Sequence, residues 1–136
     1  MKTWTFAILV SALIVMAAPQ GEDGSPPMEF DTYWMVFLER GEKRADYTEE
    51  QRASIQTKHL AHLSAMKKQG YMLVAGPLEV APDEKMRGLC LYRSDLEQEE
   101  VKKLASQDPA VAAGVLSVRV IKWWMPKGGL SFAAEK

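Results

Sequence analysis

Two strand–helix–strand units follow one another in this sequence, and their order restricts the folds that the chain can adopt. The first unit is expected to have a strand at 32–40, a helix at 48–69 and a strand at 71–76. The second unit is expected to have a strand at 86–93, a helix at 95–107, a short helical turn after Asp108-Pro109 and a strand at 115–125. The predicted order is therefore β-α-β-β-α-β.

Residues at the predicted helix ends support both helices. Thr48 and Gln51 have the spacing of a capping box before the first helix, and Gly70 follows that helix as a C-terminal stop. Ser94 and Glu97 repeat the capping-box spacing, which predicts that the second helix begins directly after Ser94.

The order β-α-β-β-α-β is typical of the ferredoxin-like fold, in which two helices cover one face of a four-stranded antiparallel sheet. A strand with one face in water should alternate apolar and polar residues. The first strand is instead apolar on both faces, with Tyr33, Met35 and Phe37 alternating with Trp34, Val36 and Leu38. The second face therefore needs a cover. We predict an α+β domain that forms a homodimer through its sheets, a dimeric α+β barrel.

The N-terminal residues 1–17 indicate a secretory signal peptide, because Lys2 precedes an apolar stretch that ends in small residues, with cleavage expected after Ala17. The apolar run is shorter than the ~20 residues of a membrane-spanning helix. We therefore expect an exported protein, periplasmic or secreted, with no stable membrane association after signal removal. Residues 18–31 are expected to form a flexible linker, 32–125 the domain and 126–136 a flexible tail.

The composition excludes several classes of partner. The chain has 17 basic and 18 acidic residues, with no arginine-rich patch for nucleic acid and no glycine-rich loop for phosphate. Its single cysteine, Cys90, rules out an intrachain disulfide and lies in the apolar run GLCLY, which favours a buried, inert thiol.

Two histidines fall on the apolar side of the first helix when it is drawn as a helical wheel. His59 and His62 share that side with Ile55, Leu63 and Met66. A core-facing histidine is commonly an imidazole that donates to a backbone carbonyl. The three-residue spacing could also hold a metal, but no third ligand accompanies the pair, so no metal site is expected.

Asp108 is the second candidate for chemistry. Followed by Pro109, it has the pattern of a helix N-cap, which contributes ~1 kcal/mol. A carboxylate that orients an imidazole would instead build a general base near neutral pH. Because a carboxylate has two oxygens, it can do both. The residues alone leave these alternatives open.

Three further residues are candidates for contact with a substrate. Gly76 and Pro77 indicate a turn at the end of a strand, where the backbone can approach a ligand closely. Trp123 and Trp124 project to opposite faces of the last strand, so one of them is expected in the core and the other at an interface or pocket wall. We take Gly76, Pro77 and Trp123 as the substrate-binding candidates.

The motifs around these residues resemble those of the YCII-related domain family over about residues 32–125. They are the histidine eleven residues before Gly70, the Ala-Gly-Pro at 75–77 and the Asp-Pro…Ala-Gly at 108–114. The resemblance implies a ferredoxin-like dimeric α+β barrel and a relation to muconolactone isomerases and similar ring-processing enzymes. It also implies a histidine–aspartate active site at His59 and Asp108, whereas His62 has no counterpart.

Two functions fit these observations. In the first, a lyase or isomerase that needs no metal or organic cofactor uses His59 to remove a proton from a small molecule, while Asp108 fixes the tautomer. In the second, a non-catalytic small-ligand binding or interaction module uses His59 as a hydrogen-bond donor. A His59 nitrogen within ~3.2 Å of an Asp108 oxygen, beside an open cavity, would favour the enzyme.

Overall fold

The computed structural model describes residues 27–132, so the signal peptide predicted at 1–17 lies outside the described residues. In chain order the elements are β1 (Phe30–Arg40), the 3-10 helix η1 (Glu42–Asp46), α1 (Glu49–Lys68), β2 (Met72–Pro77), β3 (Met86–Tyr92), α2 (Gln98–Ser106), α3 (Pro109–Ala112) and β4 (Leu116–Pro126). The predicted β-α-β-β-α-β order is confirmed; α3 is the short helical turn expected after Asp108-Pro109, and η1 is an addition.

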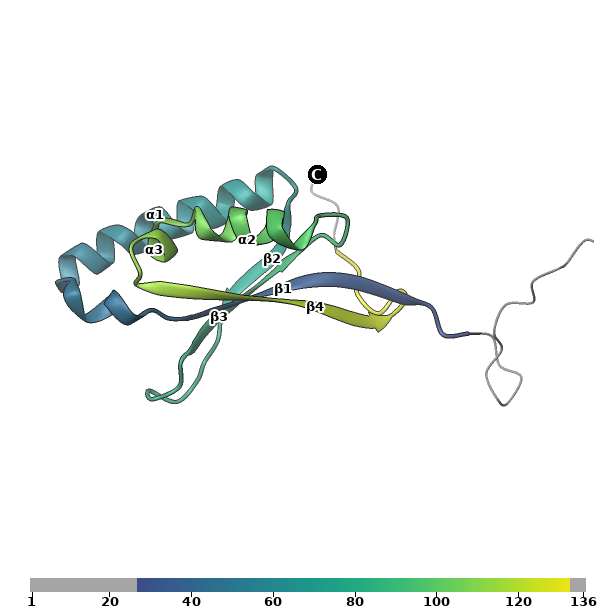
Figure 1. Cartoon of the computed structure of the whole chain (residues 1–136), viewed down its shortest axis with the longest axis horizontal. Helices are drawn as coiled ribbons and strands as arrows, with labels where there is room; N and C mark the ends of the chain where they lie inside the picture. Colours follow the sequence, from purple (N-terminus) through teal and green to yellow (C-terminus); the bar gives the residue numbers. More distant parts are fainter. Residues whose placement is uncertain (1–26, 133–136) are drawn as a thin grey trace, which may run out of the picture.

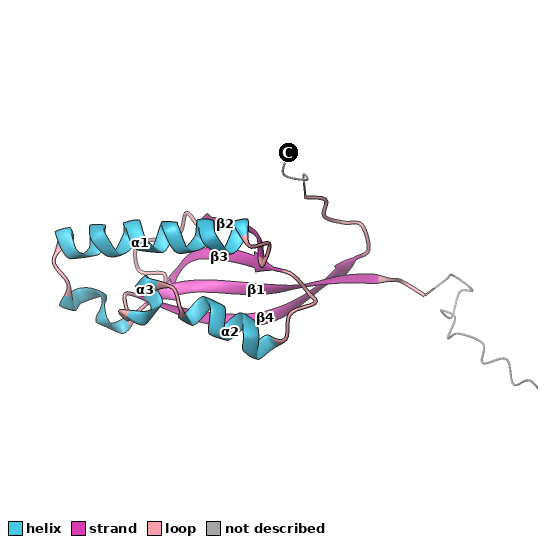
Figure 2. Ribbon diagram, turned by 90° about the horizontal axis from the view of Figure 1, so that it is seen from above, coloured by secondary structure: helices cyan, strands magenta, loops and turns pink. Residues whose placement is uncertain are grey.

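The four strands form one antiparallel sheet in the order β2-β3-β1-β4. Strand β1 is central, and its ladder with β4 runs without a register shift from Phe30–Pro126 to Arg40–Leu116. The helices lie on one face of this sheet (Figure 1). Seen from above, α1 lies over the β2 side and α2 over the β4 side (Figure 2). This arrangement is the ferredoxin-like α+β fold.

Alternation along β1 divides the sheet into a covered and an open face. Trp34, Val36 and Leu38 point toward the helices and are buried. The residues between them point to the open face, where they are only partly buried. That open face also receives apolar side chains from the other strands, and its apolar members are Tyr33, Met35, Phe37, Val74, Leu89, Leu91, Ile121 and Trp123. The apolar character expected for both faces is therefore present.

The capping box predicted for the second helix is wrong. Helix α2 begins at Gln98 rather than directly after Ser94, and its N-cap Glu97 makes no side-chain cap hydrogen bond. The reason is a contact with the core. The indole N–H of Trp34 donates to the carbonyl of Leu96 at 2.8 Å, and the Leu96 side chain is itself buried. This bond holds the segment before α2 in a turn.

The β1–β4 ladder extends into the segments expected to be a linker and a tail. Strand β1 starts at Phe30, inside the expected linker, and β4 runs through Pro126 into the expected tail. Beyond it, the backbone N–H of Lys127 donates to the Glu29 carbonyl at 3.0 Å. Within residues 27–132, no helix is both long and apolar enough to cross a membrane.

Candidate active site

Helix α1 fixes the position of His59. The capping box predicted at its start is present: the Thr48 hydroxyl accepts from the Gln51 backbone N–H, and the Gln51 side chain accepts from the Thr48 backbone N–H. The helix is followed by Gly70 in the left-handed region, with φ of 74°. Two of its residues are buried, His59 and Met66. His59 therefore comes from the inner side of a well-capped helix.

The short helix α3 fixes the position of Asp108. As its N-cap, the Asp108 carboxylate accepts from the backbone N–H of Ala110 through Oδ1 at 2.8 Å, and Pro109 is the first helical residue. The Asp108 side chain is almost fully enclosed, with 2 % of the residue exposed. The capping interpretation of this residue is therefore correct.

The second oxygen of the same carboxylate holds His59. Asp108 Oδ2 lies 2.6 Å from His59 Nδ1, and His59 is 6 % exposed. An ionised carboxylate only accepts hydrogen bonds, so a neutral imidazole in this contact would carry its proton on Nδ1 and a lone pair on Nε2. The two oxygens of Asp108 therefore make separate contacts, one with the backbone of α3 and one with the ring of His59.

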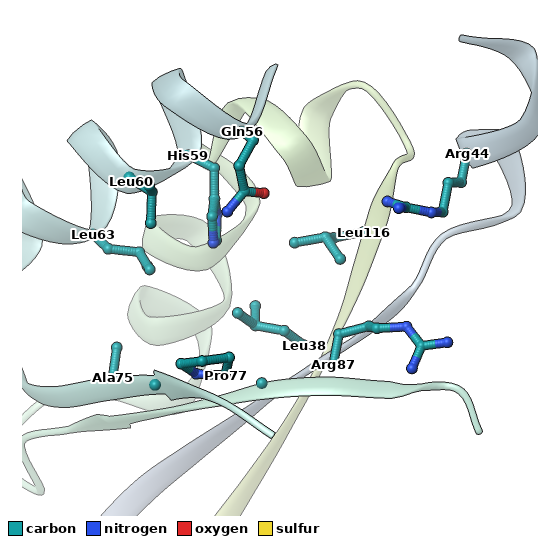
Figure 3. A pocket seen from close by; sticks show the side chains of 12 residues that line it. Leu38, Arg44, Gln56, His59, Leu60, Leu63, Ala75, Pro77, Arg87 and Leu116 are labelled. Atoms are coloured by element: carbon teal, nitrogen blue, oxygen red, sulfur yellow. The ribbon is translucent and has the colours of Figure 1, made fainter. Parts of the chain in front are cut away.

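A cavity of about 370 Å³ lies beside His59, between α1 and the covered face of the sheet (Figure 3). His59 projects into it from α1. Its volume falls at the lower end of the range for small-molecule pockets. The lining residues are Leu38, Arg44, Gln56, His59, Leu60, Leu63, Ala75, Gly76, Pro77, Arg87, Gly88 and Leu116. The geometric condition set for an enzyme is met, because the cavity and the short His59–Asp108 contact occur together.

The substrate-binding candidates divide into two groups. Gly76 and Pro77 line the cavity with His59. Trp123 is not among the lining residues. It pairs with Tyr33 in the sheet, with ring centroids 6.4 Å apart, on the open face. Side chains of a strand alternate between faces, and Leu116 already occupies the covered face of β4, so Trp123 points away from the cavity.

The second histidine does not take part in this site. His62 is half-buried, does not line the cavity, and its Nε2 has no hydrogen-bond partner. In the part of the chain that the structure describes, no three side chains of His, Cys, Asp or Glu gather as a metal ion would require.

Three polar residues of the cavity were not predicted from the sequence. Gln56 precedes His59 by three residues on α1, so the helical spacing was a usable signal. Arg44 comes from η1, in a segment for which no element was expected, and Arg87 comes from β3. Nothing in their local sequence indicates that these two arginines meet at one cavity.

Two other ionisable groups near the core are unsuited to chemistry at neutral pH. Burial raises the pKa of the Cys90 thiol to about 12, with a smaller contribution from the charge of Asp108. Burial also raises the pKa of the Tyr92 hydroxyl, and the charges of Cys90 and Asp108 add to the effect. Cys90 is thus the buried, inert thiol that its apolar surroundings predicted.

Comparison with known proteins identifies one domain type. The model of the YCII-related domain matches residues 33–125. A similar solved structure is the 5-chloro-2-hydroxyhydroquinone dehydrochlorinase from Burkholderia phenoliruptrix AC1100, in complex with 2,5-dihydroxybenzoquinone. It has 18 % sequence identity and a TM-score of 0.44, and the alignment covers 68 % of this chain and 90 % of that chain. Among curated proteins, none matches the chain.

Proposed function

This chain belongs to the YCII-related domain family, and we propose that it is a lyase- or isomerase-type enzyme in which His59 is the general base. One observation carries the proposal: His59 is bound to Asp108 through Nδ1 at 2.6 Å and lines a cavity of about 370 Å³. Asp108 then orients the ring and stabilises the imidazolium that forms.

The proposed step is the removal of a proton from carbon. His59 Nε2 takes the proton of an acidic C–H bond, and the electron pair of that bond moves into a new carbon–carbon double bond or an enolate. In a lyase, a group on the neighbouring carbon leaves with its own electron pair. In an isomerase, the imidazolium returns the proton to a different carbon. Both outcomes balance without a further reactant.

The test is a search for carbon deprotonation in D₂O. The purified protein is incubated with a panel of small lactones and phenols and followed by ¹H NMR. We expect at least one compound to lose a carbon-bound proton signal or to give a product. His59→Gln should slow this reaction by about 10²-fold or more, because a general base contributes about that factor. His62→Gln is the matched control and should keep the rate.

The same experiment separates the enzyme from a binding module. If no compound exchanges or reacts, but one binds saturably and still binds His59→Gln, the protein is a non-catalytic ligand-binding module. If His59→Gln keeps the full rate on a compound that reacts, His59 is not the base. Circular dichroism of each variant establishes that the comparison is made between folded proteins.

A homodimer is part of this proposal. The open face of the sheet carries partly exposed apolar side chains from all four strands, among them Phe37, Leu89 and Ile121. Large contiguous apolar surfaces are typical of interfaces. A second copy placed on this face would bury them and complete the predicted dimeric α+β barrel.

Export to the periplasm or the medium is also proposed, on the basis of residues 1–17. Intact mass spectrometry of the protein recovered from fractionated cells tests it. We expect a mature chain that begins at Ala18, in the periplasm or medium. A full-length chain confined to the cytoplasm would contradict export.

A further inference from the structure

The cavity beside His59 is positively charged. Its lining includes two guanidinium groups, from Arg44 and Arg87, and no carboxylate. In the close view both arginines lie on the same side of the cavity, beyond Leu116 and Leu38 as seen from His59 (Figure 3). The rest of the lining is mostly apolar, and its other polar side chains are those of Gln56 and His59.

Backbone contacts fix the position of Arg44. This residue lies in η1, which packs against the connection between α3 and β4. A Cβ atom added to Gly41 would lie only 2.1 Å from the carbonyl oxygen of Gly114, so only glycine permits this approach. The Tyr47 hydroxyl at the other end of η1 donates to the carbonyl of Ala113 at 3.0 Å. These contacts place Arg44 at the cavity even though its side chain is exposed.

Arg87 is held by neutral groups only. Its guanidinium donates to the backbone carbonyls of Met86 at 3.0 Å and Pro82 at 3.4 Å. A guanidinium has five N–H donors, so several remain for a ligand. The half-buried Arg87 is therefore fixed in place without being neutralised.

Two other arginines of the domain are paired with carboxylates. Arg93 lies 2.9 Å from Asp95, and Arg119 lies 3.0 Å from Glu39. Within residues 27–132, neither Arg44 nor Arg87 has such an ion pair. Arg40 and Arg52 also lack a carboxylate partner, but their guanidinium groups donate to backbone carbonyls and neither residue lines this cavity. Both arginines that do line the cavity beside His59 are therefore unpaired with a carboxylate. An anionic group on the ligand would supply the missing partner.

We propose that the cavity binds a small ring compound that carries a carboxylate. The carboxylate lies between Arg44 and Arg87, the ring packs on Leu38 and Leu116, and an acidic C–H bond of the ring faces His59. A cavity of about 370 Å³ suits a molecule of one ring with short substituents. The inference rests on the proposed function for the role of His59, and it adds the class of substrate.

Benzoate and its neutral analogue benzamide test the charge requirement. Their dissociation constants for the purified protein are measured by NMR titration, because the two probes share the ring and differ in charge. We expect benzoate to bind about tenfold more tightly, the size of effect typical of a charge-assisted hydrogen bond. Arg44→Gln and Arg87→Gln should each reduce this preference, and the double variant should bind both probes equally. Arg93→Gln is the matched control and should leave the preference unchanged.

Two results would overturn the inference. One is that benzoate does not saturate the protein or binds no more tightly than benzamide. The other is that the folded double variant keeps the preference. His59→Gln separates this inference from the proposed reaction, since it removes the base but neither arginine. Benzoate preference that persists in a protein without any exchange activity would support the carboxylate site and reject the enzyme.

Discussion

The carboxylate of Asp108 lies 2.6 Å from the imidazole of His59 and at the same time caps helix α3. One oxygen accepts from the ring of His59, and the other accepts from the backbone N–H of Ala110 at 2.8 Å. Both residues are buried. The side chain that caps helix α3 is therefore the same one that holds the ring of His59.

Replacing Asp108 by Asn should preserve the fold and reverse the tautomer of His59. Asn caps helices as well as Asp, so its oxygen keeps the bond from Ala110. Its NH₂ group then faces His59 Nδ1 and donates to it, which moves the ring proton to Nε2. We expect the rate of carbon deprotonation to fall by up to about 10⁴-fold, as in the equivalent change in serine proteases.

Asp108→Ala is the companion variant, and it separates the cap from the dyad. It removes the cap as well as the partner of His59, so its free energy of unfolding should lie about 1 kcal/mol below that of Asp108→Asn. Urea denaturation of both variants measures this difference. Equal stability of the two variants would mean that the cap contributes nothing to α3.

Gly41→Ala should destabilise the protein and weaken the carboxylate site. The added Cβ would lie 2.1 Å from the Gly114 carbonyl oxygen, which forces η1 and its Arg44 away from the cavity. We expect a loss of about 1–3 kcal/mol in the free energy of unfolding, typical of overpacking. Gly76→Ala is the control for stability alone, since a Cβ there meets nothing within 4 Å. Equal stability of the two variants in thermal melts would contradict the tight approach of Gly41 to Gly114.

Alkaline pH should destabilise the native state through Cys90 and Tyr92. Burial raises the pKa of Cys90 from its usual 9.0 to about 12, and the pKa of Tyr92 also rises. The unfolded chain then releases these protons at lower pH than the native chain. The free energy of unfolding is therefore insensitive to these groups below pH 9 and falls as the pH rises from 9 towards 12. Urea denaturation across this range should give a smaller fall for Cys90→Ala, and an identical fall would contradict the shift.

A charge placed on the open face of the sheet should prevent dimerisation. Ile121 is exposed on that face, opposite Met35 in the sheet. In Ile121→Lys a dimer would have to bury an unpaired ammonium group, so we expect a monomer by light scattering after size exclusion. Leu60→Lys adds the same charge at an exposed position of α1 and should leave the dimer intact. A dimeric Ile121→Lys would place the interface elsewhere.

Local patterns were sufficient for most of the fold. The ends of α1 follow from Thr48, Gln51 and Gly70, which act within one helical turn of the backbone that they cap. The start of α2 could not be predicted in this way, because the bond between Trp34 and Leu96 joins residues 62 positions apart. Such a contact exists only once the sheet and the helices have packed.

Motifs in the sequence point to four residues of the candidate site. His59, Gly76 and Pro77 line one cavity, and the buried Asp108 contacts His59. Trp123, a substrate-binding candidate, lies on the open face instead. Alternation separates the two faces of β4, but it does not show which face the helices cover.

The presence of Arg44 and Arg87 at the cavity could not be predicted from the sequence, for a different reason. Arg44 reaches the cavity because Gly41 and Gly114 bring two distant backbone segments together. That contact depends on the tertiary structure, and neither glycine stands in a motif that indicates it. Arg87 lies within strand β3, and its local sequence does not indicate which elements pack over that strand.

The central claim is that Asp108 holds the proton of His59 on Nδ1 and leaves Nε2 as a free base facing the cavity. Long-range ¹H–¹⁵N NMR of the histidine side chains tests it directly, with His62→Gln used to assign the two rings. The account predicts that neutral His59 has a protonated Nδ1 and an unprotonated Nε2, and that Asp108→Asn exchanges these two signals. A His59 ring protonated at Nε2 in the unaltered protein would contradict it.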